Sequence, residues 1–126
     1  MIDPKEVQDL LQELLSQPLT AFPKRGERLQ CSCERGVYIV YRDDGSVLHV
    51  GNTPRGKDGL FGRLDDHLRG RSSFTRELFN RKGHLLREGH SYRCLPVDKP
   101  RMRVLLQALA IGVLCPEHLG TWNPPG

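Results

Sequence analysis

The chain has 126 residues, of which 37% are hydrophobic and 27% are charged, and its formal net charge is +4. This length is typical of one domain that buries a core without disulfides or a structural metal. No apolar run approaches the length that crosses a bilayer, and the first residues lack the basic and apolar segments of a signal peptide. We therefore expect a cytoplasmic protein with no membrane partner.

The charge is unevenly distributed along the chain. Residues 1–34 contain four basic and six acidic side chains, whereas residues 55–103 contain thirteen basic and six acidic ones. Fourteen of the nineteen cations are arginines, whose planar guanidinium groups suit phosphate. A basic middle region predicts binding to nucleic acid, and a solvated helical surface is the alternative explanation for the same charges.

The N-terminal residues predict an amphipathic helix over residues 3–16. Asp3 is suited to cap it, its leucines recur at helical spacing, and Pro18 ends it. We assign residues 1–17 to this helix, as a packing element, and residues 18–34 to a connector.

A β-hairpin is expected next. Residues 36–42 alternate in a β-rich run that places Tyr38 on the opposite face from Val37 and Ile39. The turn at residues 43–46 contains Asp-Gly, a strong hairpin signal, and residues 47–50 return.

The second half of the chain predicts helices around one further strand. The expected elements are a helix at 60–68, a second helix that Ser72 or Ser73 caps and that runs to about Asn80, a strand at 91–97 and a helix at 100–114. The last helix is apolar nearly all round, so we expect it to be the buried central helix, with Gln107 as its one long polar side chain. The fold class is α+β: a small three-stranded, mainly antiparallel sheet flanked by helices, with an added N-terminal helix.

The cysteines and several histidines receive no functional role from the sequence. Cys31 and Cys33 are too close for a usual zinc knuckle, and without a secretory signal disulfides are not expected. We therefore expect free or buried thiols at all four cysteines: Cys31, Cys33, Cys94 and Cys115. We expect three histidines at the surface: His84, His90 and His118.

One ordered set of motifs resembles a known family. The set is Gly36-Val37-Tyr38, His49-Val50-Gly51, Gly59-Leu60-x-x-Arg63-Leu64-x-x-His67-Leu68, and Leu105 to Ile111 followed by Pro116. Together these motifs resemble the core of the GIY-YIG nuclease domain, over about residues 35–123. We therefore treat residues 35–126 as a GIY-YIG-like nuclease domain.

The resemblance implies hydrolysis of phosphodiester bonds in DNA, with RNA not excluded, using one divalent ion, Mg²⁺ or Mn²⁺. It implies that Tyr38 touches or activates the attacking water and that Arg63 holds the scissile phosphate. His49 stands where the family has a second tyrosine, and His67 matches a histidine of restriction-type members. The loss of that tyrosine need not abolish activity, because imidazole accepts a proton near neutral pH. Residues expected to bind nucleic acid are Arg55, Lys57, Arg69, Arg71 and Arg76.

Gln107 departs from the family pattern, which has a metal-ligating glutamate there. A neutral amide does not offset the charge of a hard cation, so we expect activity to be weakened or abolished. Three explanations are open: an introduced Glu→Gln change, which the otherwise intact site favours; a natural domain that binds nucleic acid without cutting it; or another carboxylate, Glu117 or Asp66, that serves the metal. Asn123 is a weaker match to an asparagine common in the family.

Two other functions compete with a nuclease. One is a non-catalytic nucleic-acid-binding module that uses the same basic surface. The other is a protein-interaction domain for which the acidic N-terminal helix is the docking face.

Overall fold

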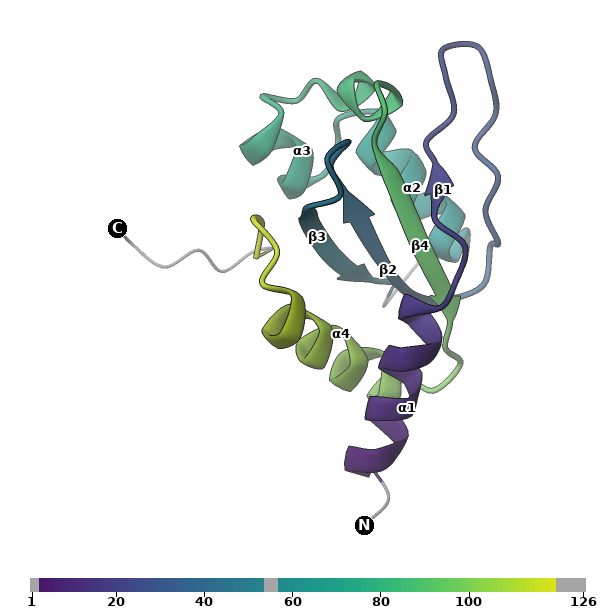
Figure 1. Cartoon of the computed structure of the whole chain (residues 1–126). Helices are drawn as coiled ribbons and strands as arrows, with labels where there is room; N and C mark the ends of the chain where they lie inside the picture. The colour runs from purple at the N-terminus through teal and green to yellow at the C-terminus, as the bar shows by residue number, and fades with distance from the viewer. Residues whose placement is uncertain (1–2, 54–56, 120–126) are drawn as a thin grey trace.

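The sheet has four strands and is antiparallel throughout, in the order β1-β4-β2-β3. The computed structural model of the chain describes residues 3–53 and 57–119 (Figure 1). The strands are β1 (Thr20–Ala21), β2 (Gly36–Tyr41), β3 (Val47–Asn52) and β4 (Ser91–Pro96). The α+β class is confirmed, but the expectation of three strands is wrong. The extra strand, β1, lies in the expected connector and pairs with Ser91 and Tyr92, and two residues are too few to show an alternating pattern.

Helices cover both faces of this sheet. They are α1 (Asp3–Leu15), α2 (Gly59–Leu68), α3 (Ser73–Leu78), the short 3₁₀ helix η1 (Gly83–Arg87) and α4 (Pro100–Leu114). The N-cap of α3 is Ser72, whose side chain accepts a hydrogen bond from the Thr75 N–H. The helix ranges agree with the sequence-based expectations to within about two residues, the usual uncertainty of helix ends.

The face beneath α1 and α4, the α1–α4 face, is built almost wholly from apolar side chains. Strand alternation directs every second residue of β2 to this side. The buried members of this core are Leu11, Leu14, Val37, Ile39, Tyr41, Val50, Leu95, Val97, Met102, Leu106 and Ala110. The N-terminal helix is therefore part of the core of the domain.

The opposite face, the α2–α3 face, mixes apolar and polar groups. Its apolar members are Phe22, Leu29, Tyr38, Val40, Leu48, Leu60, Leu64, Leu68, Phe74, Leu86 and Tyr92. Polar side chains are buried beside them: His49, His67, Ser72, Thr75 and His118. Buried polar groups need hydrogen-bond partners, so this face must contain an organised polar network.

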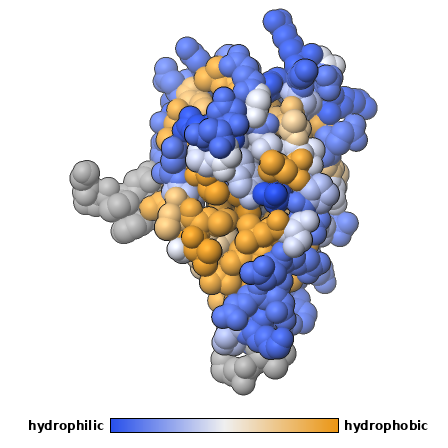
Figure 2. All heavy atoms as spheres, viewed as in Figure 1, coloured by the Kyte–Doolittle hydropathy of each residue, from blue (hydrophilic) through white to orange (hydrophobic). Residues whose placement is uncertain are grey.

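The expectation that α4 is a buried central helix is wrong. One side of α4 packs on the sheet through Leu106 and Ala110. The other side is open, and Val104 and Val113 are 59% and 57% exposed. Figure 2 shows hydrophobic residues gathered over this part of the molecule. An all-round apolar helix is ambiguous, because apolar residues on its outer face look the same in sequence as buried ones.

Among the described residues, no helix has the length and apolar character needed to cross a membrane.

Candidate active site

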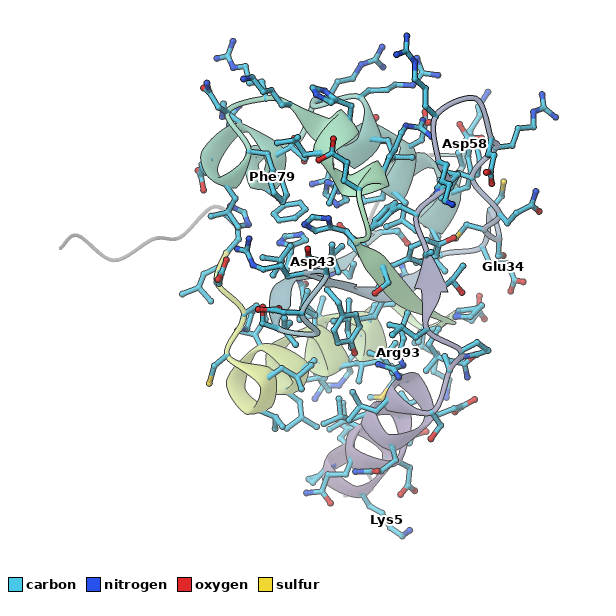
Figure 3. All side chains as sticks on the ribbon, turned by 45° about the horizontal axis from the view of Figure 1, so that its top comes forward. Lys5, Glu34, Asp43, Asp58, Phe79 and Arg93 are labelled. Carbon is cyan, nitrogen blue, oxygen red and sulfur yellow. The ribbon has the colours of Figure 1, made fainter. Side chains whose placement is uncertain are left out.

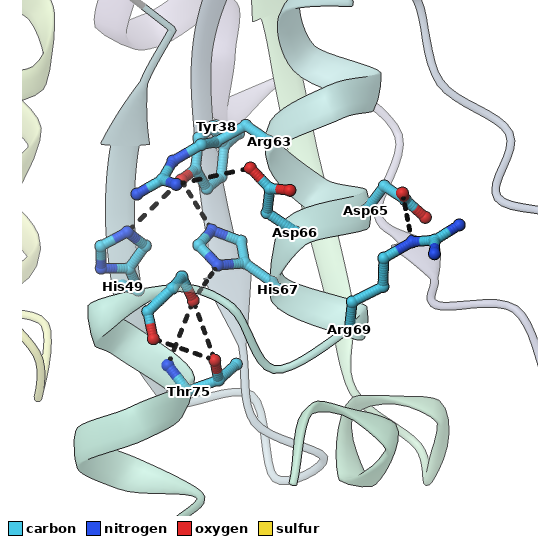
Figure 4. Close-up of polar contacts among 9 residues, drawn as sticks. Tyr38, His49, Arg63, Asp65, Asp66, His67, Arg69 and Thr75 are labelled. Atoms are coloured by element: carbon cyan, nitrogen blue, oxygen red, sulfur yellow. Dashed lines mark hydrogen bonds and ion pairs between the residues drawn. The ribbon is translucent and has the colours of Figure 1, made fainter. Parts of the chain in front are cut away.

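Tyr38 of β2 is the centre of the buried polar network. Its side chain is fully buried, and its Oη lies 2.7 Å from His67 Nε2 and 3.4 Å from His49 Nε2 (Figure 4). Antiparallel pairing sets Val40 opposite His49 and Tyr38 opposite Gly51, which places Tyr38 and His49 on one face of the sheet. The third partner, His67, comes from the last turn of α2.

Gly51 is required by the position of the Tyr38 ring. A Cβ atom built at Gly51 would collide with the ring and hydroxyl of Tyr38. A glycine at this point of β3 lets the tyrosine lie directly over the neighbouring backbone. The glycine of the His49-Val50-Gly51 motif therefore has a packing function.

His67 connects Tyr38 to the start of α3. Its Nδ1 lies 2.6 Å from Ser72 Oγ, and Ser72 Oγ lies 3.0 Å from Thr75 Oγ1. A neutral imidazole satisfies both contacts, because one of its ring nitrogens donates a hydrogen bond and the other accepts one. The same serine thus caps a helix and orients an imidazole.

His49 connects Tyr38 to two residues that the sequence did not single out. His49 Nδ1 lies 3.0 Å from His118 Nδ1, and His118 Nε2 lies 2.6 Å from Glu77 Oε2. Phe74 stacks on His49 with ring centroids 4.8 Å apart. The Glu77 side chain is 37% exposed. Polar contacts therefore run from the surface at Glu77, through two imidazoles, to the buried Tyr38 hydroxyl.

The expectation that His90 and His118 lie at the surface is wrong, because they are 8% and 2% exposed. His84 is exposed, as expected. His118 is buried because the segment after α4 runs beside β3, where the His118 N–H donates to the Leu48 carbonyl at 2.8 Å. A single bridge of this kind leaves no periodic signal in the sequence.

Burial keeps the central groups of the network uncharged at neutral pH. Desolvation, with smaller contributions from His118 and Arg63, lowers the pKa of His49 to about 3. Desolvation, reinforced by His49 and Arg63, also holds the pKa of His67 well below its ordinary value. Desolvation raises the pKa of Tyr38, and the neighbouring Arg63 guanidinium opposes that shift. The phenol therefore acts as a hydrogen-bonding group in this environment.

A cavity of about 620 Å³ opens beside α2 and the end of β3. Arg63 and Gln107 both line it, as do Lys57 and Arg71. Tyr38, His49 and His67 are absent from its lining and lie buried. Arg63 separates the two regions: its guanidinium lies beside Tyr38 and faces Asp66, with Nη1 3.8 Å from Asp66 Oδ2 (Figure 4).

The other expected nucleic-acid contacts are less closely grouped. Arg69 Nε lies 2.7 Å from Asp65 Oδ2, and Arg76 is exposed on α3. Arg55 and Asn123 lie outside the described residues. Of the cations expected to contact nucleic acid, Lys57 and Arg71 thus share the cavity with Arg63.

Gln107 makes its own hydrogen bonds within this cavity. Its Oε1 accepts from Asn52 Nδ2, and its Nε2 donates to the Val50 carbonyl at 3.3 Å. Asn52 Oδ1 is buried with no hydrogen-bond partner. The side chain is therefore directed at the end of β3, on the same cavity as Arg63.

The cavity offers both amide and carboxylate oxygens as candidate ligands for a divalent cation. In the described part of the chain, no three His, Cys, Asp or Glu side chains are grouped as metal ligands require. The amide oxygens of Gln107 and Asn52 carry no net charge. Three carboxylates line the cavity, those of Asp58, Asp65 and Asp66, of which Asp65 is paired with Arg69 and Asp66 with Arg63. Glu117 is outside the cavity lining, and its Oε2 lies 2.5 Å from Arg42 Nη2. Its position therefore does not favour it as a substitute metal ligand.

Comparison of the chain with protein-family models and with curated proteins gives no match. Interpretation of the site therefore rests on its residues and geometry.

Proposed function

We propose that this chain is a cytoplasmic endonuclease domain of the GIY-YIG type that acts on phosphodiester bonds in DNA, with cleavage weakened or abolished by Gln107. The observation that carries the proposal is the position of Tyr38. Its hydroxyl is held between His67 and His49, with Arg63 between it and the cavity that contains Gln107. Phosphate hydrolysis needs a positioned water and positive charge beside the phosphate oxygens, and the Tyr38 hydroxyl and the Arg63 guanidinium are suited to these two tasks.

Arg63 has the central role in this proposal. A bound phosphate replaces Asp66 as its partner, because a guanidinium forms two parallel hydrogen bonds with phosphate oxygens. The charge of Arg63 then stabilises the negative charge that develops on those oxygens. Lys57 and Arg71 hold the neighbouring phosphates along the cavity.

Tyr38 orients the attacking water through its hydroxyl. Movement of Arg63 toward a phosphate uncovers this hydroxyl. Because burial raises the pKa of Tyr38, the phenol stays protonated, and His67 and His49 fix its direction. Positioning of this kind lowers the barrier without a change in charge at the tyrosine.

The decisive experiment restores the acidic side chain at the metal position. We expect Gln107→Glu to nick supercoiled plasmid in the presence of Mg²⁺ or Mn²⁺, because a carboxylate supplies the anionic oxygen that these ions prefer. Adding Arg63→Ala to this variant should lower the cleavage rate by about 10²–10³-fold, with an unchanged circular dichroism spectrum.

Arg101→Ala is the matched control, because it removes an exposed arginine that pairs with Asp3 on the other side of the domain. It should leave cleavage unchanged. If Gln107→Glu cuts no DNA or RNA substrate, the catalytic proposal is wrong.

A second candidate function is binding of nucleic acid without cleavage. The hydrogen bond from Asn52 to Gln107 favours it, because it satisfies the side chain in the absence of a cation. We expect this chain to bind labelled duplex DNA more weakly as salt rises, since cations that contact phosphates release counterions. Arg71→Ala should reduce the slope of the logarithm of the binding constant against the logarithm of the salt concentration by about one unit. Arg101→Ala should leave this slope unchanged. Absence of binding to any nucleic acid at low ionic strength would exclude this function.

A further inference from the structure

Two cysteines far apart in sequence meet beside the central strand. Cys31 Sγ and Cys94 Sγ are 3.8 Å apart, although 63 positions separate the residues in the chain. Cys94 lies in β4 directly opposite Tyr38. Both thiols are half-buried and pack against the α2–α3 face. The other two cysteines, Cys33 and Cys115, are exposed.

The backbone around Cys31 is anchored on both sides. Before it, the Gln30 carbonyl accepts from the Tyr92 hydroxyl at 2.8 Å. After it, the Ser32 and Glu34 carbonyls accept from the Phe61 and Leu60 N–H groups, each at 2.9 Å. These bonds fasten the connector to β4 and to the start of α2, and Figure 3 shows Glu34 on the same side of the molecule as Asp58. The approach of the two sulfur atoms is therefore a feature of the fold.

The pKa values of the two thiols are shifted in opposite directions. A hydrogen bond with Cys94 lowers the pKa of Cys31, and burial opposes that shift. The same hydrogen bond, together with burial, raises the pKa of Cys94. Because the thiolate is the reactive form of cysteine, these opposite shifts favour Cys31 as the attacking group and Cys94 as the resolving group.

We propose that Cys31 and Cys94 are a redox modification site that closes reversibly to a disulfide by exchange with a low-molecular-weight disulfide such as oxidised glutathione. Closure must bring the sulfur atoms from 3.8 Å to a bond of about 2.05 Å. A transient, regulatory disulfide is the kind found in reducing compartments.

The exchange proceeds in two balanced steps. The Cys31 thiolate attacks one sulfur of the small disulfide, which breaks its S–S bond, forms a mixed disulfide and releases a small thiolate that takes up the proton Cys31 lost to solvent. The Cys94 thiol then loses its proton to solvent and attacks Cys31 Sγ, which breaks the mixed disulfide, forms the protein disulfide and releases the second small thiolate, which is protonated in turn. Two protein thiols are oxidised, and one small disulfide is reduced to two thiols.

The disulfide would fix the connector to the strand beside Tyr38. The connector carbonyls at Cys33 and Glu34 lie against Gly59, one of the residues that line the cavity. Closure of the disulfide therefore restrains the side of the cavity where α2 begins. This site is independent of the proposed nuclease function, because it is defined by the two sulfur atoms alone.

The test uses the Cys33→Ser/Cys115→Ser double variant, which keeps the half-buried pair and removes both exposed thiols. After treatment with oxidised glutathione, intact mass spectrometry should show a loss of about 2 Da with no retained glutathione, and dithiothreitol should reverse it. Thiol titration of the unfolded protein should fall from two groups to none. The oxidised form should melt at a temperature several degrees higher, because the cross-link restricts the unfolded chain.

Adding Cys94→Ser to this double variant tests the role of the resolving thiol. It should retain one glutathione on Cys31, since no second thiol is available to release it. A stable glutathione adduct, or no reaction, in the double variant itself would overturn the proposal.

Discussion

The two faces of the sheet are built from the same strands but differ in chemistry. The α1–α4 face receives Val37, Ile39 and Tyr41 from β2 and is almost wholly apolar. The α2–α3 face receives Tyr38 and contains a network of buried imidazoles and hydroxyl groups. Apolar burial stabilises a fold without demanding exact geometry, but buried polar groups are tolerated only with correctly placed partners. One face is therefore an apolar core, while the other holds buried polar side chains in a defined arrangement.

Lowering the pH should reduce the free energy of unfolding, mainly through the buried histidines of the α2–α3 face. His49 has a folded pKa of about 3 against an ordinary 6.5, and the pKa of His67 is also lowered. A group with a depressed folded pKa contributes stability above its unfolded pKa, and that stability is lost as the pH falls from about 6.5 toward the folded pKa. Each imidazole should therefore lower the free energy of unfolding by about 1.4 kcal/mol per pH unit in this window.

Urea unfolding between about pH 7 and pH 4 measures this slope. His67→Gln should reduce it by about 1.4 kcal/mol per pH unit, because one titrating group is removed. His84→Gln, at an exposed histidine, is the control and should leave the slope unchanged. Equal slopes for His67→Gln and the parent would contradict the neutral, buried state of His67.

A cavity on the α1–α4 face should cost stability and leave the polar network unaffected. Leu106→Ala removes a fully buried side chain and should lower the free energy of unfolding by about 2–5 kcal/mol. Val104→Ala on the outer side of the same helix should change it by less than about 0.5 kcal/mol. The two free energies come from urea unfolding, and a similar loss in both variants would mean that α4 packs differently.

Two glycine substitutions should have opposite signs. Gly51→Ala places a methyl group against Tyr38 and should destabilise the protein by about 1–3 kcal/mol, and it should abolish cleavage in the Gln107→Glu background. Gly112→Ala in α4 meets no atom within 4 Å and should stabilise by about 0.5–1 kcal/mol. Thermal and urea unfolding measure the change in stability of both variants. If Gly51→Ala leaves the free energy of unfolding unchanged, the Tyr38 ring moves aside without an energetic cost.

The smallest expected effect is at the surface end of the network. Glu77→Gln keeps the shape of the side chain but weakens its hydrogen bond to His118, so it should lower stability by about 0.5–1.5 kcal/mol. Glu88→Gln, at an exposed glutamate, is the matched control. Imidazole NMR signals of His49 and His118 should shift in Glu77→Gln and not in the control. Unchanged signals would mean that Glu77 does not influence the network.

Much of the fold was predictable because its signals are local. The Asp-Gly turn, the cap at Ser72 and the alternation through Tyr38 act within a few residues, and the helices and hairpin follow from them. β1 was missed because its pairing depends on β4, about 70 residues away. The burial of α4 was overestimated because residues such as Val104 look identical in sequence whether they face the core or solvent.

The candidate site was predictable only in part. Sequence order and spacing indicated five residues of the site. The structure brings Tyr38, His49 and His67 into contact. Arg63 and Gln107 line one cavity. Sequence did not reveal that the first three are shielded from that cavity. Glu77 and His118 were missed because their contact joins α3 to a segment 41 residues later.

The segment that carries His118 also covers part of an edge strand of the sheet. β3 lies at one edge of the sheet, and such edges readily pair with strands of other molecules. The Glu117 and His118 N–H groups occupy the Val47 and Leu48 carbonyls, at 3.2 and 2.8 Å. The segment that follows α4 therefore takes up two carbonyl groups of this edge strand that a strand from another molecule would otherwise use, and the same segment brings His118 into the histidine network.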